Sequence, residues 1–304
     1  MSASPPVRLL RPVGPADLDA VHALVEASDI ADSGEPDLTR ADVAAVLGSP
    51  AAEAWAVSGA DGTLSACGWV ESRSGRPAVE GEFFVAPEAD LAVVEPVLER
   101  MLLAAALDDD HRPLRLYVNS ARPDKCGLLE ARGATVVRHF FRMACGLGRT
   151  GRDVSLPAGT EIRTIRDEGA DLRAMHDVMT EAFADHWGSS PAPYDEWLQR
   201  NRGRVDFDAS LWWLVSDGGK PVAGLIATVS DREGYVNSLG VRRAHRGRGL
   251  ARGLLIHAFR EFAARGLPQA ALSVDAANPT GAVRLYESVG MTPAASWALY
   301  ELPR

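Results

Sequence analysis

The 304-residue chain contains two similar halves, and this duplication constrains its fold more than any other feature. Four short similarities recur in the same order, at offsets of 155 to 158 residues. They pair Arg8–Pro12 with Arg163–Arg166, Trp55–Val57 with Trp213–Val215, Phe84–Val85 with Gly240–Val241, and Leu129–Gly133 with Tyr286–Gly290. A nearly constant offset over four ordered matches indicates two copies of one fold, each of about 145 residues.

A segment rich in glycine separates the two copies. Between Gly146 and Gly159 the sequence has four glycines and one proline without an apolar period, which is typical of a linker. We therefore expect an N-terminal domain over residues 1–148, a linker over 149–159 and a C-terminal domain over 160–304.

The two copies predict the same order of elements. Runs of apolar and β-branched residues between turn residues predict strands. In the C-terminal copy these are Glu161–Ile165, Leu211–Val215, Pro221–Val229, Gly234–Val241 and Ala270–Val274. Apolar residues at helical spacing predict a helix between Gly249 and Gly266 and another over Thr280–Ser288. Strands that alternate with helices in this way predict a mixed sheet of the α/β or α+β class.

The charge balance narrows the possible partners. Lys and Arg number 32 against 41 Asp and Glu, so the net charge is −9, and the pI is near 5.3. Such a chain lacks the broad positive field of a non-specific nucleic-acid binder. The longest apolar run, Met101–Leu107, is far below the roughly 20 residues that span a bilayer. We expect a cytoplasmic monomer or homodimer with no nucleic-acid or membrane partner.

The cysteines and the first residues of the sequence do not indicate a metal site, a disulfide or a signal peptide. Cys67, Cys126 and Cys145 form no CxxC motif and have no neighbouring histidine at metal-ligand spacing, so neither a metal site nor a disulfide is expected. Met1–Pro6 has neither a basic flank nor an apolar core, so it is not expected to be a signal peptide.

The most informative stretch follows the strand that is expected to end at Val241. Five arginines lie between Arg242 and Arg252, and Gly247 and Gly249 stand just before the next helix. A glycine turn that leads into a helix N-terminus presents several backbone N–H groups, with the helix dipole behind them, to a pyrophosphate. The alternative is a solvated turn with a run of charge. The turn lacks Gly-Lys-Ser/Thr, so it is not a P-loop, and its glycine spacing is not that of a dinucleotide fingerprint.

These residues resemble a known superfamily. Arg246-x-x-Gly249-x-Ala251 is similar to the Arg/Gln-x-x-Gly-x-Gly/Ala signature of the GNAT superfamily of acyl-coenzyme A dependent N-acetyltransferases. The block from Asn278 to Met291 resembles a second family motif, with Ala282, Leu285, Tyr286 and Gly290 in the expected places. The resemblance is strong over Glu161–Arg304 and faint over the first half, and it implies two tandem GNAT-like domains, each a mixed, mostly antiparallel sheet flanked by helices.

The resemblance also implies a site for acetyl-coenzyme A in the C-terminal domain. The strand end is expected to bind the pantetheine, with the backbone N–H of Val241 polarising the thioester carbonyl, and the glycine turn is expected to bind the phosphates. The implied coenzyme-binding residues are Leu239, Gly240, Val241, Arg246, Gly247, Arg248, Gly249, Leu250, Ala251, Asn278 and Tyr286.

Acyl transfer to an amine requires a neutral amine and a proton for the departing thiolate. The resemblance places the Tyr286 hydroxyl near the coenzyme sulfur as the acid, and a half-buried core tyrosine is the alternative. Glu233 is the first candidate for the base, against a solvated turn carboxylate, and Asp275 is the second. His186 is a third, against a loop histidine packed on Trp187.

The acceptor pocket is expected around the loop that follows the first helix of the C-terminal domain and along the strand face that Glu233, Tyr235 and Asn237 share. The candidate acceptor-binding residues are Asp185, His186, Trp187, Tyr235, Asn237 and Asp275.

The first copy differs from the second at the positions that coenzyme binding and catalysis would require. Its loop after Val85 carries Glu88 and Asp90 and no glycine, which is unfavourable for a pyrophosphate in both charge and backbone geometry. Leu129 stands where Tyr286 stands in the second copy, so the hydroxyl is missing. We expect a catalytically silent N-terminal domain that holds a coenzyme structurally or encloses the acceptor.

The sequence thus predicts an acetyl-coenzyme A dependent N-acetyltransferase that acts on a small-molecule primary amine by direct transfer in the C-terminal domain. Tandem GNAT domains with an intact second copy are similar to the mycothiol synthase group, whose acceptor is a cysteinyl amine. Two alternatives stay open at this point: a catalytically inert acyl-coenzyme A binding or sensor protein, and a protein N-acetyltransferase.

Overall fold

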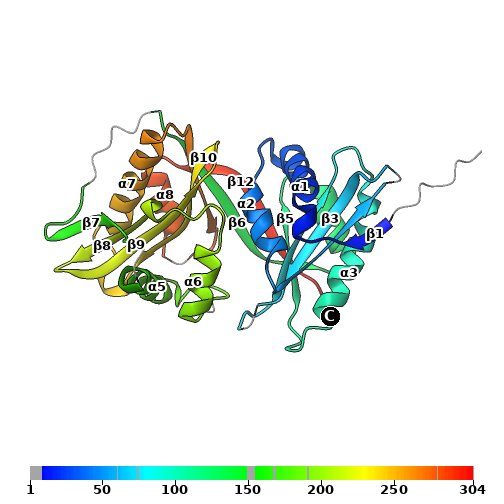
Figure 1. Ribbon diagram of the computed structural model, residues 1–304, viewed down its shortest axis with the longest axis horizontal. Coiled ribbons are helices and arrows are strands. Elements are labelled where there is room, and N and C mark those ends of the chain that lie inside the picture. The colour runs from blue at the N-terminus through cyan, green and yellow to red at the C-terminus, as the bar shows by residue number, and fades with distance from the viewer. Residues whose placement is uncertain are drawn as a thin grey trace, which may run out of the picture. The chain divides into compact units, whose positions relative to one another are not determined.

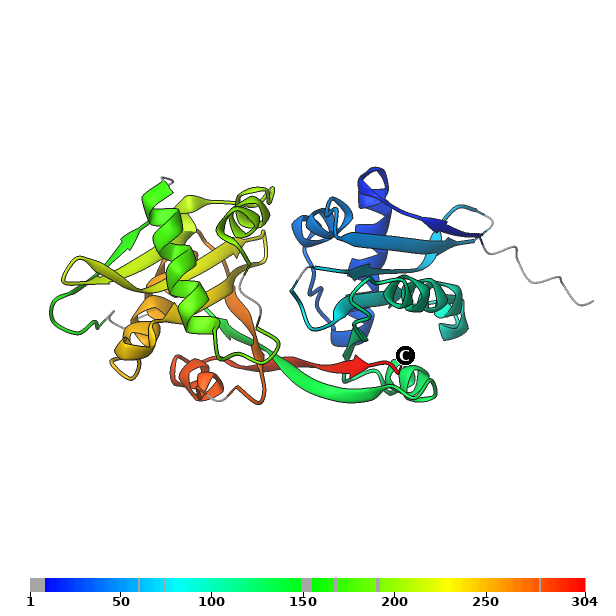
Figure 2. The same cartoon turned by 90° about the horizontal axis from the view of Figure 1, so that it is seen from below.

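In a computed structural model of the protein, the structure describes residues 9–59, 61–73, 75–148, 155–166, 169–189, 192–278 and 280–303. The chain divides into two compact units (Figures 1 and 2). Unit 1 comprises Met1–Phe140 together with Ala295–Arg304, and unit 2 comprises Phe141–Ala294.

Unit 1 is a sheet with the strand order β1-β2-β3-β4-β5-β12. Its strands are β1 (Leu9–Pro12), β2 (Ala52–Ser58), β3 (Leu64–Glu71), β4 (Val79–Val85), β5 (Leu114–Asn119) and most of β12 (Thr292–Glu301). Its helices are α1 (Leu18–Ser33), α2 (Arg40–Leu47), α3 (Glu95–Ala106) and α4 (Pro123–Glu130). Strand β6 (Thr135–Gly146) begins in this unit and ends in unit 2.

Unit 2 repeats this plan with the strand order β11-β10-β9-β8-β7, and the end of β6 lies beside β11. Its strands are β7 (Thr160–Thr164), β8 (Trp212–Asp217), β9 (Lys220–Val229), β10 (Glu233–Val241) and β11 (Gln269–Asp275). Its helices are α5 (Gly169–Phe183), α6 (Tyr194–Arg202), α7 (Leu250–Ala264) and α8 (Ala282–Ser288).

The two units have the same topology, which confirms the mixed, mostly antiparallel fold inferred from the sequence. In unit 1, β1 to β4 pair antiparallel and β4 pairs parallel with β5. In unit 2, β7 to β10 pair antiparallel and β10 pairs parallel with β11. Because a parallel pair needs a crossover, α3 and α7 each connect the two strands of their parallel pair.

Helices cover both faces of each sheet. In unit 1, α3 contacts β2, β3 and β4, while α1 packs on β3 and β4 and is joined by α2. In unit 2, α5 packs on β9 and β10, and α7 packs on β8, β9, β10 and β11. Large apolar side chains fill these layers, and Met101 in unit 1 and Trp213 in unit 2 are almost completely buried.

The unit boundary differs from the division expected at residues 148 and 160. The last strand, β12, pairs antiparallel with β5 from Trp297↔Asn119 to Glu301↔Arg115, so the end of the sequence completes the sheet of unit 1. Phe141–Gly146, conversely, counts with unit 2, where Met143 is buried in the core. Residues 149–154 of the expected linker lie outside the described residues.

The helix expected from Thr280 starts two residues later, at Ala282, because Gly281 rather than Asn278 is its N-cap residue. The Oδ1 atom of Asn278 instead accepts hydrogen bonds from the backbone N–H and hydroxyl of Thr280, which closes a turn before the helix. Asn278-Pro279 also matches the residue types preferred at an N-cap and at a first helical position, but Pro279 lies outside the described residues.

In the described ranges, no helix combines the length and the apolar character that crossing a bilayer requires.

Because β12 completes the sheet of unit 1, we expect a substitution near the end of the sequence to destabilise unit 1. Leu302 is 3% exposed, packs in the core of unit 1 and donates its backbone N–H to the carbonyl of Leu114. We expect Leu302→Ala to lower the free energy of unfolding of unit 1 by about 2–5 kcal/mol. Hydrogen exchange read by mass spectrometry should become faster in β5 and stay unchanged in β9.

The exposed Leu103 of α3 provides the control, since Leu103→Ala should change stability by no more than about 0.5 kcal/mol. Faster exchange in β9 with β5 unchanged would contradict the assignment of Ala295–Arg304 to unit 1.

Candidate functional site

Strand β10 contains a bulge that shapes the candidate site. Its pairing with β9 shifts register between Val236 and Ser238, so Asn237 is the extra residue. Thr228 on β9 donates its hydroxyl to Asn237 Oδ1 at 3.1 Å.

The bulge moves side chains from one face of the sheet to the other. Without it, Gly234 and Gly240, six residues apart, would lie on the same face. A Cβ on Gly234 would meet the Phe262 ring of α7 at 2.2 Å, whereas one on Gly240 would meet Met179 and Ala182 of α5 at 2.9 Å. The two glycines therefore let opposite helices approach the two halves of one strand.

Beyond the bulge, β10 and β11 separate. Their parallel pairing runs from Glu233↔Gln269 to Val236↔Leu272 and stops there. Strand β10 nevertheless continues to Val241 and β11 to Asp275. The edge of β10 that carries Leu239, Gly240 and Val241 is thus not paired with β11, and its backbone groups face the opening between the strands.

The glycine turn lies at the end of this open edge. Gly247 and Gly249 have φ values of +75° and +85°, which L side chains rarely adopt. Gly249 is the N-cap residue of α7, and no side chain caps this helix. The first N–H groups of α7, from Leu250 and Ala251 on, have no acceptor within the helix. They are free to bind an anion at the positive end of the helix dipole.

Carboxylates already pair with much of the positive charge of this segment. Arg243 binds Asp185 at 2.6 Å, and Arg248 binds Asp217 at 2.7 Å. Arg242 pairs with Glu181, which also accepts the backbone N–H of Arg243. The anion-binding capacity of the turn therefore depends chiefly on its backbone N–H groups.

Arg246 fixes the turn instead of pairing with a carboxylate. Its guanidinium donates to the carbonyl of Val241 at 3.3 Å and to that of Ala182, near the end of α5, at 2.9 Å. The signature arginine thus ties the end of β10 to α5.

His186, in the loop after α5, lies close enough to Asp275, the last residue of β11, for the two to interact electrostatically. The His186 ring lies 4.5 Å from that of Phe183, centroid to centroid. Burial lowers the pKa of His186 below its usual value, and the charge of Asp275 opposes this shift only in part. His186 is therefore neutral at pH 7 and able to accept a proton. Asp275 Oδ1 accepts the N–H of Ala277 at 2.8 Å.

Tyr286 lies on α8 and packs against the core of unit 2. Burial raises the pKa of its phenol to about 12, so the hydroxyl keeps its proton at physiological pH. The structure thus gives the ring the half-buried position of the alternative reading and also leaves it with a proton to donate.

Glu233 is placed differently from the expected base. It starts β10 and lies roughly 25 Å from Val241 at the usual rise of a strand. Its carboxylate is buried, accepts bonds of 2.7 and 2.5 Å from Arg142 and is also bound by Gln269 at 3.0 Å. A carboxylate that is held in an ion pair at the far end of the strand is a poor base for a reaction at the opening.

The remaining candidates are distributed along the same region. Asp185 is held by Arg243, as described above, and Trp187 is 37% exposed. Tyr235 precedes the bulge and pairs with Thr228 and Ala271, while Asn237 is the exposed bulge residue. In the part of the chain that the structure describes, no cluster of three or more His, Cys, Asp or Glu residues is arranged to hold a metal ion.

The corresponding loop of unit 1 is built differently. Asp90 accepts the backbone N–H of Ala92 at 2.8 Å, so a carboxylate occupies a donor that a phosphate would need. Glu88 adds negative charge, Glu95 pairs with Arg132, and Leu129, in the place of Tyr286, is completely buried. Unit 1 thus shares the backbone plan of unit 2 and differs from it in the side chains of this loop.

Sequence reasoning missed two residues that support the glycine turn and one that explains Glu233. Glu181 anchors two arginines of the turn and Ala182 accepts from Arg246, while Arg142 binds Glu233 from 91 residues away in the sequence. No local pattern marks them, because each acts only through contacts that the fold creates.

Comparison with known proteins gives a consistent result. The family model described as the acetyltransferase (GNAT) family matches residues 172–291. A mycothiol acetyltransferase of Thermobispora bispora is 31% identical over 290 residues, covering 91% of this chain and 93% of its own length. One of Geodermatophilus obscurus is 31% identical over 305 residues and covers 96% of both chains.

Two solved structures share the fold over the whole chain. A GCN5-related N-acetyltransferase from Sphaerobacter thermophilus is 29% identical with a TM-score of 0.77, covering 97% of this chain and 96% of its own. A tandem GNAT protein from the clavulanic acid biosynthesis pathway has a TM-score of 0.74 at 15% identity, covering 98% and 99% of the two chains.

Proposed function

Because the chain belongs to the GNAT family of acetyltransferases, we propose that unit 2 transfers the acetyl group of acetyl-coenzyme A directly to a small-molecule primary amine. The observation that carries this proposal is the separation of β10 from β11 above an uncapped glycine turn. An extended chain bearing an amide fits an unpaired strand edge, and a pyrophosphate fits the free N–H groups beyond it.

The residues present suit this co-substrate. A Cβ on Gly247 or Gly249 would meet no heavy atom within 4 Å, so the space over the turn is open. Leu239, Gly240 and Val241 would bind the pantetheine arm through their backbone, with the Val241 N–H as the polariser of the thioester carbonyl. Arg246 would keep the turn in place, and Asn278 is proposed as a further contact.

The acceptor is proposed by analogy with the relatives named mycothiol acetyltransferase, which suggest a cysteinyl conjugate among small amines. Free-thiol release from acetyl-coenzyme A, measured with cysteinyl conjugates, polyamines and aminoglycosides, tests the proposal. A sensor protein would bind acetyl-coenzyme A without turnover, and a protein acetyltransferase would use peptides and leave all small amines unmodified.

Tyr286 is the proposed acid. Its hydroxyl stays protonated over the working pH range and would donate to the thiolate as that group departs. Acid strength is not the source of its effect, since a phenol with a pKa near 12 is a weaker acid than a thiol with a pKa of about 8.5. Its contribution is a donor held at the place where negative charge develops.

His186 is the proposed base, in place of Glu233. It lies at the opening, is neutral at pH 7 and interacts with Asp275, whose negative charge favours the protonated ring once a proton has been taken. Trp187 and Asp185 of the same loop and Tyr235 and Asn237 of β10 are proposed as walls of the acceptor pocket.

We further propose that unit 1 is catalytically silent. Its loop carries acidic residues, and Asp90 binds backbone N–H of its own chain, which leaves no cradle for a pyrophosphate. Acetyl-coenzyme A is accordingly expected to bind at one strong site per chain.

The two ends of α7 provide a matched test of coenzyme binding. Gly249 and Gly266 both have φ near +80° and open space where a Cβ would lie, but only Gly249 belongs to the glycine turn. Each change to Ala should cost about 1–2 kcal/mol of stability through the same left-handed strain. We expect Gly249→Ala to weaken acetyl-coenzyme A binding at least about tenfold by calorimetry and Gly266→Ala to leave it unchanged. Equal affinities in both variants would remove the turn from the site.

The acid role predicts a loss in the rate constant. Tyr286→Phe should lower kcat by about 10²-fold, with little change in KM for acetyl-coenzyme A, because the missing interaction forms as the thiolate departs. Tyr300 of β12, whose hydroxyl binds Glu130 in unit 1, is the control, and Tyr300→Phe should keep kcat. If the Tyr286 variant retains more than about a third of the wild-type kcat, its hydroxyl is not the acid.

The two base candidates predict different pH profiles. In the wild type, kcat/KM should fall as the pH drops through the pKa of His186, which lies below 6.5, because the protonated ring cannot accept a proton. His186→Asn should remove this acid limb and lower kcat. Glu233→Gln should keep both the limb and kcat but reduce the free energy of unfolding of unit 2 by about 3–5 kcal/mol, because it breaks the buried ion pair between Glu233 and Arg142. Loss of the limb in the Glu233 variant alone would restore Glu233 as the base.

A further inference from the structure

The loop that carries the proposed acceptor residues joins α5 to α6, two helices that pack against each other in unit 2 (Figure 1). It follows Phe183, ends before Tyr194 and contains Asp185, His186 and Trp187. Its first part is held close to α5, because the backbone N–H of His186 donates to the carbonyl of Phe183 at 3.0 Å. The position of the loop therefore depends on how its other end is attached.

His176 of α5 attaches that other end. Its Nε2 atom lies 2.9 Å from the carbonyl oxygen of Ala192, the residue before the N-cap Pro193 of α6. A carbonyl oxygen can only accept a hydrogen bond, so Nε2 carries the proton and donates it. The hydroxyl of Thr180, one turn further along α5, lies 3.4 Å from the same nitrogen. The imidazole thus connects α5 to the last part of the loop.

Aromatic side chains of α6 hold the His176 ring in place. Tyr194 and Trp197 meet it edge-on, with ring centroids 5.5 and 5.4 Å from its own. The guanidinium of Arg173, one turn earlier on α5, lies 4.0 Å from the centroid of the Tyr194 ring. The His176 side chain is 14% exposed. Because the ring is enclosed, it loses little conformational freedom when it makes the hydrogen bond to the loop.

The carbonyl of Ala192 depends on this donor. Among the residues that the structure describes, no second group donates a hydrogen bond to it. Removal of the His176 donor would therefore free this end of the loop, and water would have to take its place.

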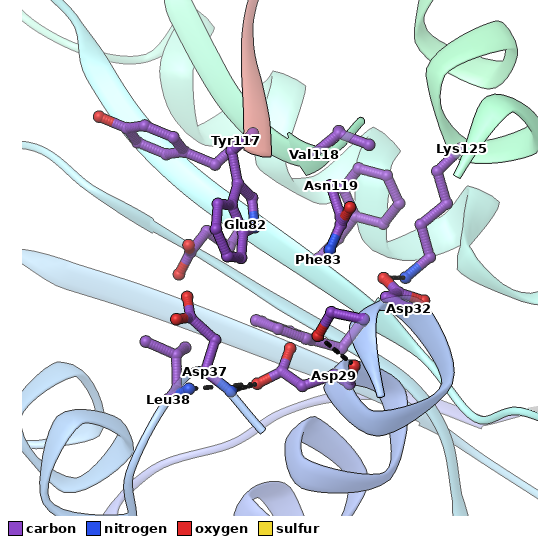
Figure 3. Close-up of a pocket in the computed structure, with 13 residues that line it drawn as sticks. Asp29, Asp32, Asp37, Leu38, Glu82, Phe83, Tyr117, Val118, Asn119 and Lys125 are labelled. Atoms are coloured by element: carbon purple, nitrogen blue, oxygen red, sulfur yellow. Dashed lines mark hydrogen bonds and ion pairs between the residues drawn. The ribbon is translucent and has the colours of Figure 1, made fainter. Parts of the chain in front are cut away.

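Unit 1 fixes its corresponding loop at the same point with different chemistry. The Asp29 carboxylate of α1 accepts the backbone N–H groups of Asp37 and Leu38 at 3.0 and 3.2 Å (Figure 3). Leu38 precedes Thr39, the N-cap residue of α2. In both units a side chain of the first helix thus binds the backbone of the residue just before the N-cap of the second helix. The recurrence of this contact with unrelated residues indicates that the fold requires the end of this loop to be fixed.

We propose that His176 is a positioning residue for the acceptor: by binding the carbonyl of Ala192 it fixes the loop that places His186 and Trp187 at the opening. This inference rests on the acetyl transfer proposed for unit 2. A loop that is not fixed must be ordered when the acceptor binds, and the entropy lost in ordering it weakens acceptor binding. The coenzyme is proposed to bind through β10 and the glycine turn, so its binding should not depend on His176.

Substitutions at position 176 separate the hydrogen bond from the packing of the ring. His176→Phe keeps an aromatic ring and removes the donor. In the thiol-release assay with a cysteinyl conjugate as acceptor, it should raise the acceptor KM about 5- to 10-fold, as expected for the loss of one hydrogen bond. The KM for acetyl-coenzyme A should not change, and kcat should fall by less than about threefold. His176→Gln, whose amide nitrogen can replace Nε2 as the donor, should bring the acceptor KM back to within about twofold of the wild type.

His257 of α7 provides the matched control. Its ring meets Trp213 edge-on at 5.3 Å, and no described residue forms a hydrogen bond with it. His257→Phe makes the same chemical change in the same unit and should leave the acceptor KM unchanged.

Hydrogen exchange read by mass spectrometry tests the attachment without any substrate. We expect exchange in residues 184–189 to become faster in His176→Phe, to return to the wild-type rate in His176→Gln, and to stay unchanged in α7 throughout. If the wild type releases no thiol, the transfer proposal fails by itself, whereas loop exchange that is unchanged in His176→Phe overturns the present one. An unchanged acceptor KM in His176→Phe, an equal rise in both KM values or a lack of rescue by His176→Gln would also overturn it.

Discussion

The bulge at Asn237 is the constraint on which the site of unit 2 depends. One extra residue reverses the faces of β10, so that its first half packs on α7 through Gly234 and its second half on α5 through Gly240. The same departure from regular pairing coincides with the end of the β10–β11 ladder at Val236. A sheet in which β10 paired with β11 as far as Val241 would leave no unpaired strand edge next to the glycine turn.

The two units show how one backbone plan supports two electrostatic environments. Both sheets open where a parallel pair ends, after Val236 in unit 2 and after Glu82 in unit 1. In unit 2 this opening leads to an uncapped helix N-terminus, whereas in unit 1 Asp90 binds the equivalent loop's own N–H. The two units therefore share the opening, and they differ in the side chains that surround it.

Local patterns in the sequence predicted what depends on local structure. The strands expected in unit 2 and the two helices expected after Gly249 and from Thr280 lie within two residues of their expected positions, whereas α6 was not predicted; the glycine turn joins β10 to α7 as expected. The pairing of β12 with the sheet of unit 1 could not be inferred from the sequence. An apolar strand can pair with the sheet of either unit, and only the contacts of the folded chain decide between them. The same holds for Glu233, whose partner Arg142 is 91 residues distant.

The arginines around the glycine turn show why composition alone misleads about binding. Five arginines within eleven residues suggest a strongly positive surface, yet Asp217, Glu181 and Asp185 pair with three of them. These pairs tie the turn to β8, α5 and the loop after α5. A turn that is already fixed loses less entropy on binding a ligand than mobile arginine side chains would. The anion site proposed for unit 2 would therefore rely on backbone N–H groups and would not require the chain to carry a net positive charge.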